Sequence, residues 1–220
     1  MQKAIILSSI MVLALILNGC AQKNKDEKPN DLTANNELKS EQKAADNLNG
    51  DIAINLERSV ISWKGSMLFN FGEHYGTLLL KQGEITFADN KIVGGNFTAD
   101  MNTIWNTDGD YNKNLIDHLK NEDFFEVSKF PESSLEITGI EYVDETRMKL
   151  DANLTIKNIK RPIEIFKADY DREAHTLTAK FKIDRSEWGI NYNAKGVAKV
   201  KNHAISDAIA IEATIYLDTK

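Results

Sequence analysis

The sequence of 220 residues is poor in cysteine and histidine, and each shortage narrows the functions that it can have. Its single cysteine, Cys20, cannot form an internal disulfide, which leaves a free thiol, an intermolecular bridge or a modification site. The four histidines, at positions 74, 118, 175 and 203, never have the close pairwise spacing of a metal-binding motif. Nucleophile-elbow, dinucleotide-binding and P-loop patterns are also missing. We therefore expect no metal, no cofactor and no catalytic residues.

Positive charge is also in deficit. Lysine and arginine number 27 against 33 aspartate and glutamate residues, which gives a formal net charge of −6 at pH 7. Surfaces that bind nucleic acid are enriched in basic residues, because they neutralise phosphates. We therefore expect no nucleic-acid partner.

Long apolar runs are limited to the first 20 residues. The run from Ala4 to Leu17 is shorter than the roughly 20 residues that cross a bilayer as a helix, which disfavours a transmembrane anchor. A short positive start at Lys3 and small residues before Cys20 are typical of a secretion signal. The motif LNGC that ends at Cys20 resembles the bacterial lipobox, in which cleavage precedes the cysteine and its sulfur is acylated. We predict a lipoprotein signal peptide over residues 1–19 and a lipid anchor on Cys20.

Aromatic residues are missing from the stretch that follows the signal. It is rich in lysine, acids and amides, and cannot bury enough apolar surface to offset the entropy of ordering it. Residues 20–54 are therefore predicted to be the acylated cysteine and a flexible linker, and residues 55–220 the folded domain. Several acyl chains would hold the protein on a membrane. We expect it in the cell envelope, anchored to a bacterial membrane, with the outer membrane favoured.

What the folded part does have is alternation of apolar and polar residues, which is typical of half-buried β-strands. The first run places Ile61, Trp63, Met67, Phe69 and Phe71 on one face. Later inward-facing sets are Leu78 and Leu80, then Ile85 and Phe87 after a Gln82-Gly83 turn, then Phe97, Ala99 and Met101, Leu135 and Ile137, Met148 to Ile156, Ile163 and Ile165, Leu177 to Ile183, and Ile209 to Leu217. Turn signals stand at Asp89-Asn90 and Gly94-Gly95. Eight or nine strands with few prolines predict an antiparallel sandwich or barrel.

One segment has helical spacing instead. Leu115, Ile116 and Leu119 recur as on one helix face, Asp110 or Asn112 can cap the start, and Asn121 and Pro131 bound the end. A single amphipathic helix among strands must bury its apolar stripe on the sheet or across an open end of it. Asp117 and His118 are adjacent, so they do not face each other as an acid–base pair, and we expect both on a solvated face.

Four separate sequence segments resemble the YceI-like family in their order and spacing. They are His74-Tyr75-Gly76, NLIDHLKNEDFFEVSKFP from Asn114, ANLTIKNIKRPIEI from Ala152 and FKIDRSEWGI from Phe181. The resemblance implies an all-β, eight-stranded antiparallel lipocalin-like β-barrel, with the one short α-helix capping an end. It also implies a long pocket for an amphipathic lipid, such as a polyisoprenoid or isoprenoid quinone, and no catalytic reaction. The segment from Asn191 to Lys201 departs from the family pattern, which affects the shape of one barrel mouth.

The candidate ligand-binding residues are eight large or polar side chains in or next to these strings and strands. They are Trp63, Phe69, His74, Phe97, Phe124, Phe125, Arg185 and Trp188. The aromatic ones can line a pocket or form a solid core, since a barrel of eight strands can be filled or can hold one small ligand. Trp188 can equally plug the barrel end. For Arg185 the alternatives are a contact to a lipid head group and an ion pair with Asp184, Glu187 or a cross-strand acid.

These observations predict non-catalytic binding, sequestration or transport of an amphipathic lipid in the cell envelope. Two other classes remain open. One is a small hydrolase or isomerase that uses His74 with a carboxylate, and the other is a filled barrel that acts as an interaction protein. A homodimer is plausible by resemblance alone.

Overall fold

The computed structural model describes residues 47–69, 71–109, 111–196 and 204–218. The predicted signal peptide over residues 1–19, the acylation site Cys20 and the linker up to residue 46 lie outside the described residues. They stay predictions.

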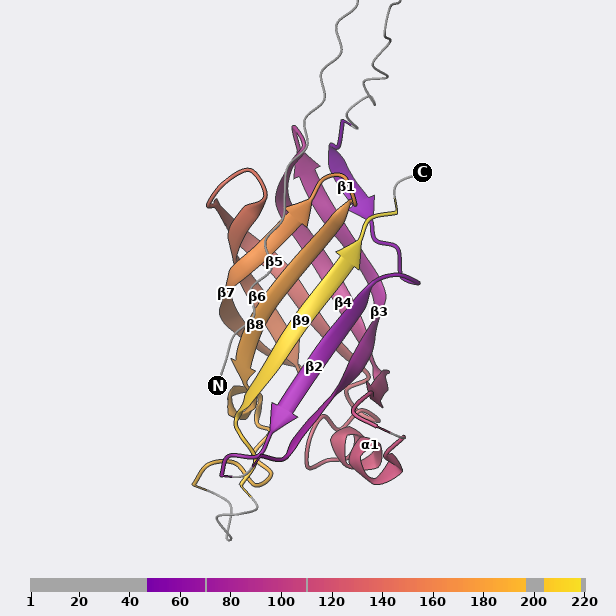
Figure 1. Cartoon of the computed structure of the whole chain (residues 1–220), viewed down its shortest axis with the longest axis vertical. Coiled ribbons are helices and arrows are strands. Elements are labelled where there is room, and N and C mark those ends of the chain that lie inside the picture. The colour runs from indigo at the N-terminus through magenta and orange to yellow at the C-terminus, as the bar shows by residue number, and fades with distance from the viewer. Residues whose placement is uncertain (1–46, 70, 110, 197–203, 219–220) are drawn as a thin grey trace, which may run out of the picture. The chain divides into compact units, whose positions relative to one another are not determined.

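The described part of the chain is almost entirely β-structure. Its elements are β1 (Gly50–Ala53), β2 (Val60–Ser66), β3 (Glu73–Ala88), β4 (Lys91–Asn106), α1 (Lys113–Lys120), β5 (Glu132–Tyr142), β6 (Arg147–Ile156), β7 (Ile159–Asp171), β8 (Thr176–Asp184), the 3-10 helix η1 (Arg185–Trp188) and β9 (Ala208–Tyr216). Figure 1 shows the strands wrapped around a common axis, with α1 at one end and β1 at the other.

Strands β2 to β9 close into a barrel. Each pairs antiparallel with the next along the chain, and β9 returns to pair with β2, with Val60 opposite Thr214 and Trp63 opposite Ile211. Closure leaves no free sheet edge along the barrel wall. The predicted all-β, eight-stranded antiparallel barrel with one short helix is confirmed.

A ninth strand, β1, extends the wall at the end away from α1. Gly50 to Ala53 pair with Phe87 to Glu84 of β3, beyond the part of β3 that pairs with β2. The next residue, Ile54, forms a bridge with Leu217. The linker predicted for residues 20–54 is therefore wrong at its carboxyl end, because residues 50–54 pair with β3 and with Leu217, which lie far away in the sequence.

Two predicted breaks lie inside long strands. Gln82 and Gly83 are part of β3, where the register with β4 shifts between Leu80 and Gln82, as in a β-bulge. The shift explains why the inward side chains change from even positions to odd ones. Gly94-Gly95 lies within β4. By contrast, Asp89-Asn90 does form the β3–β4 turn, with both residues at positive φ, as tight hairpin turns require.

The first alternating run is shorter than predicted. Strand β2 ends at Ser66, Met67 makes one isolated bridge with Ile205, and Phe71 is fully exposed. The inward placement of Phe69 and Phe71 is therefore wrong. Their spacing imitates a strand, but the chain turns back at this point to start β3.

The interior side chains fall into two groups along the barrel axis. The group near β1 fills its end of the barrel, where Phe87 and Tyr170 pack with ring centroids 5.5 Å apart and the hydroxyl of Tyr142 donates to the carbonyl of Ile92. The second group lies near α1 and includes Ile116, Leu119 and Trp188. The residues of the first group next to β1, among them Ile85, Phe87 and Tyr170, are therefore buried core.

Helix α1 begins and ends where the sequence predicts. The side chain of Asn112 accepts a hydrogen bond from the backbone N–H of Leu115, and the helix ends at the cap residue Asn121. Ile116 and Leu119 are buried against the second interior group. The helix therefore covers the end of the barrel opposite β1, as expected for its apolar stripe.

Gly76 in β3 allows a close approach of two strands. A Cβ at this position would lie 1.8 Å from the backbone oxygen of Trp105 in β4. Gly76→Ala is expected to lower the free energy of unfolding by about 1–3 kcal/mol, because the backbone must move to relieve the overlap. Gly65→Ala, where the added Cβ meets nothing within 4 Å, serves as the control in urea unfolding. Equal stability of the two variants would contradict the prediction.

Candidate ligand-binding site

The α1 half of the barrel contains a cavity of about 300 Å³. Its wall is almost entirely apolar and is formed by inward side chains of every barrel strand together with α1. An engineered apolar cavity of about 150 Å³ is large enough to bind benzene. The barrel is therefore not completely filled, and the space suits an apolar chain.

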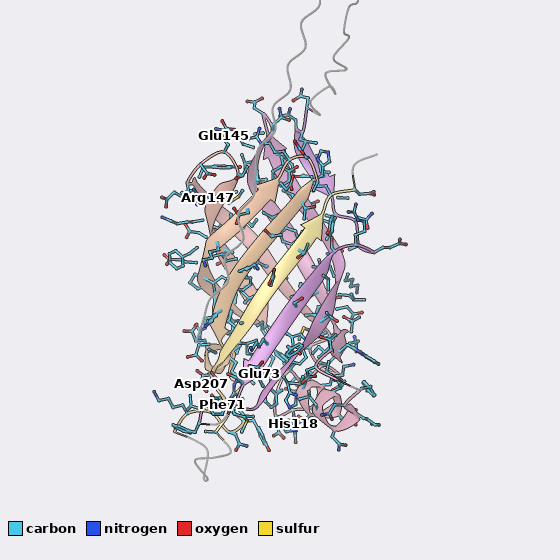
Figure 2. All side chains as sticks on the ribbon, in the orientation of Figure 1. Phe71, Glu73, His118, Glu145, Arg147 and Asp207 are labelled. Carbon is cyan, nitrogen blue, oxygen red and sulfur yellow. The ribbon has the colours of Figure 1, made fainter. Side chains whose placement is uncertain are left out.

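The cavity opens at the α1 end. Its deep part is lined by Ile137, Leu150 and Ile165, which belong to the first interior group but do not include its residues next to β1, such as Phe87 and Tyr170. Its other part reaches Glu73 and His118, which Figure 2 places with Phe71 and Asp207 at the helix-bearing end. Among the described residues, the mouth of the cavity is bordered by the β2–β3 loop, by α1 and by residues 205–206, which lead into β9.

Four of the predicted aromatic residues line this cavity: Trp63, Phe97, Phe124 and Phe125. The indole N–H of Trp63 donates to the carbonyl of Thr77, which fixes the ring across β2 and β3. Phe124 is 5% exposed and belongs to the second interior group, so it serves both as core and as cavity wall. Polar candidates His74 and Arg185 also lie on the lining.

Phe69 and Trp188 are not among the lining residues. Phe69 is 51% exposed on the β2–β3 loop. Trp188 is buried below the cavity wall, and its indole N–H donates to the carbonyl of Leu154 at 3.3 Å. The alternative in which Trp188 plugs the barrel end agrees with this position.

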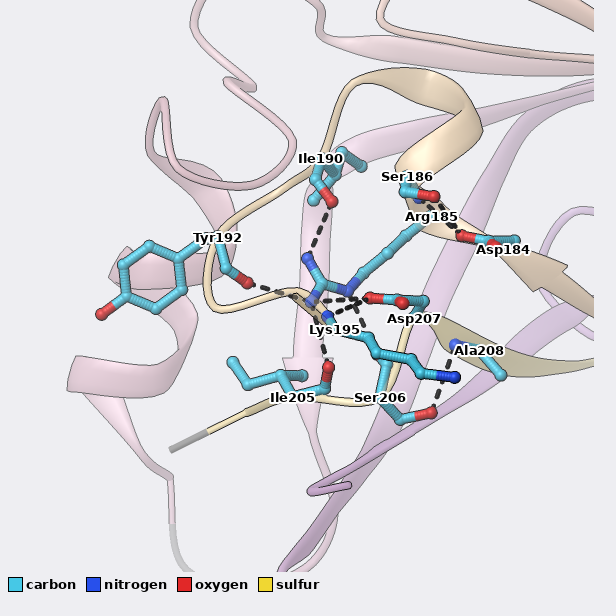
Figure 3. A network of polar contacts seen from close by, with 10 residues as sticks. All are labelled: Asp184, Arg185, Ser186, Ile190, Tyr192, Lys195, Ile205, Ser206, Asp207 and Ala208. Carbon is cyan, nitrogen blue, oxygen red and sulfur yellow. Dashed lines mark hydrogen bonds and ion pairs between the residues drawn. The ribbon is translucent and has the colours of Figure 1, made fainter. Parts of the chain in front are cut away.

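Arg185 is only 1% exposed, and its guanidinium is surrounded by backbone carbonyls (Figure 3). Nε donates to Ser206 at 3.1 Å, Nη1 to Ile190 at 2.8 Å, and Nη2 to Tyr192 at 2.9 Å and Ile205 at 3.3 Å. The carboxylate of Asp207 lies 3.6 Å from Nη2. These contacts tie residues 190–192, which follow η1, to residues 205–207, which precede β9.

The ion pair with Asp207, whose backbone oxygen also accepts from the N–H of Arg185, agrees with the predicted pair with a cross-strand acid. The sequence does not predict that most donors of Arg185 go to main-chain oxygens. Burial lowers the pKa of the guanidinium from its usual value, and the charges of Asp207 and Asp184 oppose that shift. Sequence patterns cannot show this, because the carbonyls come from residues 5 to 21 positions away along an irregular segment.

His118 lines the cavity, although its side chain is still 31% exposed, so its predicted place on a solvated helix face is only partly correct. Its ring packs edge-on against Phe124 at 5.0 Å and against Tyr192 at 4.5 Å, and it lines the cavity. Asp117 is exposed as expected. His118 thus contacts Tyr192, whose carbonyl accepts a hydrogen bond from Arg185.

His74 pairs with a carboxylate at the mouth. Its Nδ1 lies 2.5 Å from Oδ2 of Asp108, whose side chain is 11% exposed. Burial acts to raise the pKa of Asp108, but hydrogen bonds from His74, Asn106 and its own backbone outweigh burial and hold that pKa below its usual value. Asp108 is therefore an ionised acceptor that orients the imidazole.

The described residues contain no group of three or more histidine, cysteine or acidic side chains that could hold a metal ion. Within this part of the chain no helix is long and apolar enough to span a membrane.

A closed antiparallel barrel, packed at one end and open at the other onto an apolar cavity, defines the lipocalin-like class of binding barrels. Within that class the chain belongs to the YceI-like family, because the YceI-like domain matches residues 53–217. This family is generally associated with binding hydrophobic or isoprenoid ligands and is typically non-catalytic.

Known relatives are distant in sequence. Two proteins of Pseudomonas putida, both described as UPF0312 proteins, from strains W619 and GB-1, are 23% identical over 167 residues, which cover 74% of this chain and 79% of each relative. The crystal structure of BcnA from Burkholderia cenocepacia is similar with a TM-score of 0.58 at 16% identity, covering 76% of this chain and 99% of BcnA. A YceI protein of Campylobacter jejuni gives a TM-score of 0.48 at 16% identity, covering 64% of this chain and 84% of that protein. At 16% identity the similarity to BcnA supports the fold alone.

Proposed function

We propose that this protein binds and carries an amphipathic lipid of the polyisoprenoid or isoprenoid-quinone type, without catalysing a reaction. The observation that carries the proposal is the apolar cavity of about 300 Å³, whose lining reaches the helix-bearing end of the barrel. A lipid chain enters such a cavity tail first and leaves its polar head at the mouth, among Glu73, His74 and His118.

The energetics of burial are sufficient for this function. Each buried methylene contributes about 0.8 kcal/mol, so ten buried prenyl carbons supply about 8 kcal/mol before binding costs. A dissociation constant near 1 μM corresponds to about −8 kcal/mol. Micromolar to weaker binding therefore needs neither a covalent bond nor a metal ion.

The lipobox-like motif that ends at Cys20 supports a further part of the proposal. With a lipid anchor on Cys20 and a polar linker, the barrel would act in the cell envelope, tethered to the outer membrane. Anchoring keeps the cavity close to the lipids that it exchanges. A homodimer also remains part of the proposal.

The proposal is tested on the full chain produced in a bacterial host that processes lipoproteins. Organic extraction and mass spectrometry of the purified protein are expected to yield a lipid in stoichiometric amount. After extraction, the protein is expected to take up a fluorescent isoprenoid probe with micromolar affinity and to release it to unlabelled geranylgeraniol. A protein that carries no lipid and takes up no probe would overturn the proposal.

The enzyme alternative is favoured by one observation, the His74–Asp108 pair. A hydrolase of this kind also needs a nucleophile, and among the described residues no hydroxyl or thiol is hydrogen-bonded to the imidazole. The purified, lipid-extracted protein also serves to distinguish lipid binding from hydrolysis. A His74→Ala variant that keeps probe binding but loses conversion of a bound ester would support the enzyme.

A further inference from the structure

The exposed aromatic side chains of the described residues gather at one end of the barrel. Those at the helix-bearing end are Phe69, Phe71, Tyr75, Trp105, Tyr111 and Tyr192. They come from the β2–β3 loop, the start of β3, the end of β4, the β4–α1 connection and the segment after η1. Away from that end, Phe166 on β7 is the one exposed aromatic side chain that the described residues include. Exposed apolar groups that cluster in this way mark an interaction surface.

Phe71 protrudes from the β2–β3 loop beside the cavity. Its side chain is fully exposed, and Figure 2 shows it at the helix-bearing end. The base of the loop is fixed, because the N–H of Met67 donates to the carbonyl of Gly72 and the N–H of Leu68 donates to the carbonyl of Ala204, both at 2.8 Å. Met67 and Gly72 line the cavity. The loop therefore holds a phenyl ring in water at the border of the cavity.

A second aromatic group lies on the outer face of β3 and β4. The rings of Trp105 and Tyr111 stack with centroids 4.4 Å apart. Tyr75 is one diagonal step from Trp105, because Thr77 stands opposite Trp105 and the N–H of Thr107 donates to the carbonyl of Tyr75. All three rings are about half exposed. Tryptophan and tyrosine combine an apolar ring with a polar group, which suits them to the boundary between a membrane and water.

The adjoining cavity indicates which partner this surface fits. A lipid that passes between a bilayer and the cavity through water exposes its whole tail, which is costly for every methylene. A mouth held against the bilayer removes that cost. A ring that protrudes from a loop also enters a deformable lipid layer easily, whereas a rigid protein partner needs a matching hollow. A second copy of this chain on the same surface would cover the mouth.

We propose that the helix-bearing end of the barrel docks on a lipid bilayer, with Phe71 inserted among the acyl chains and Tyr75, Trp105 and Tyr111 at the level of the head groups. Lipid then enters and leaves the cavity without crossing water. This inference rests on the proposed function and adds the surface through which the barrel exchanges its lipid. A lipid anchor on Cys20 keeps the protein near a membrane but does not set which end of the barrel faces it.

The fluorescence of Trp105 tests the orientation. The full chain is mixed with vesicles of phosphatidylcholine whose acyl chains carry bromine, which quenches tryptophan on contact. Trp188 is 1% exposed and Trp63 lines the cavity, so docking brings Trp105 to the lipid. We expect quenching in the wild type and its loss in Trp105→Phe, which keeps an aromatic ring at this position. Equal quenching in both proteins, or in neither, would overturn the inference.

The rate of lipid exchange tests the role of docking. Lipid-extracted protein takes up the fluorescent isoprenoid probe from phosphatidylcholine vesicles. Phe71→Ser is expected to slow uptake about 10-fold and to leave the equilibrium affinity within about 2-fold, because docking speeds uptake and release alike. Phe166→Ser, which removes a ring that is 66% exposed on β7, is the matched control and should keep the wild-type rate.

The outcomes separate docking from lipid binding. Wild-type uptake by Phe71→Ser, or an equal loss of rate in Phe71→Ser and Phe166→Ser, would overturn docking through this end and leave the proposed function standing. The equilibrium affinity for the probe also reports that each variant is folded. A wild-type protein that binds no probe, with or without vesicles, would overturn the proposed function and this inference together.

Discussion

Replacing Ala213 with phenylalanine is expected to weaken lipid binding about 100-fold. Ala213 lies on β9, lines the cavity and stands opposite Ile61 and Ala179. A phenyl ring has the size of benzene, which occupies a cavity of about 150 Å³, or about half of the space present here. Displacing about four lipid carbons removes about 3 kcal/mol of binding free energy, which corresponds to about 100-fold.

The same substitution is expected to preserve the fold. The added ring fills empty space instead of crowding packed atoms, so the urea midpoint should equal or exceed that of the wild type. Ala210→Phe on the outward face of the same strand is the matched control, since Ala210 stands opposite Lys64 and Lys182. It should bind the probe normally. If Ala213→Phe binds as tightly as the control, the lipid does not occupy this cavity.

Replacing Arg185 with methionine is expected to lower the free energy of unfolding by about 3–5 kcal/mol. That is the usual cost of removing one partner from a buried charged pair. Here the loss leaves the carbonyls of Ile190, Tyr192, Ile205 and Ser206 without their donor, and leaves Asp207 without its cation. Since domains of this size are stable by about 5–15 kcal/mol, a large part of the stability is at stake.

Two further variants, measured by equilibrium urea unfolding, separate the contribution of the planar donor set of Arg185 from that of its charge. Arg185→Lys keeps the positive charge but not the planar set of donors, so most of the loss should persist. Arg161→Met removes an exposed arginine that donates to the carbonyl of Glu187 at 3.3 Å, and should cost below about 1 kcal/mol. A stable Arg185→Met protein that loses only affinity for anionic lipids would assign the guanidinium to the head group instead.

The candidate site was predicted in part. Trp63 and Phe97 lie on strands whose alternation extends over many residues, and both line the cavity. Phe69 continues the same alternation in the sequence, but strand β2 ends before it. A pattern of period two cannot show where a strand ends. The place of His118 was predicted only in part because the face that a short helix presents is decided by what packs on it, here Phe124 and Tyr192.

By itself the sequence determined the strands, the single helix with its caps at Asn112 and Asn121, and membership of the YceI-like family. These are local properties, since side-chain alternation and capping depend on residues a few positions apart. Only the tertiary structure decided that the barrel is hollow near α1, packed near β1, and organised at its mouth by Arg185. The physical reason is that a cavity depends on how side chains of distant strands fill the closed barrel. A buried guanidinium likewise takes whichever carbonyls the folded chain brings to it.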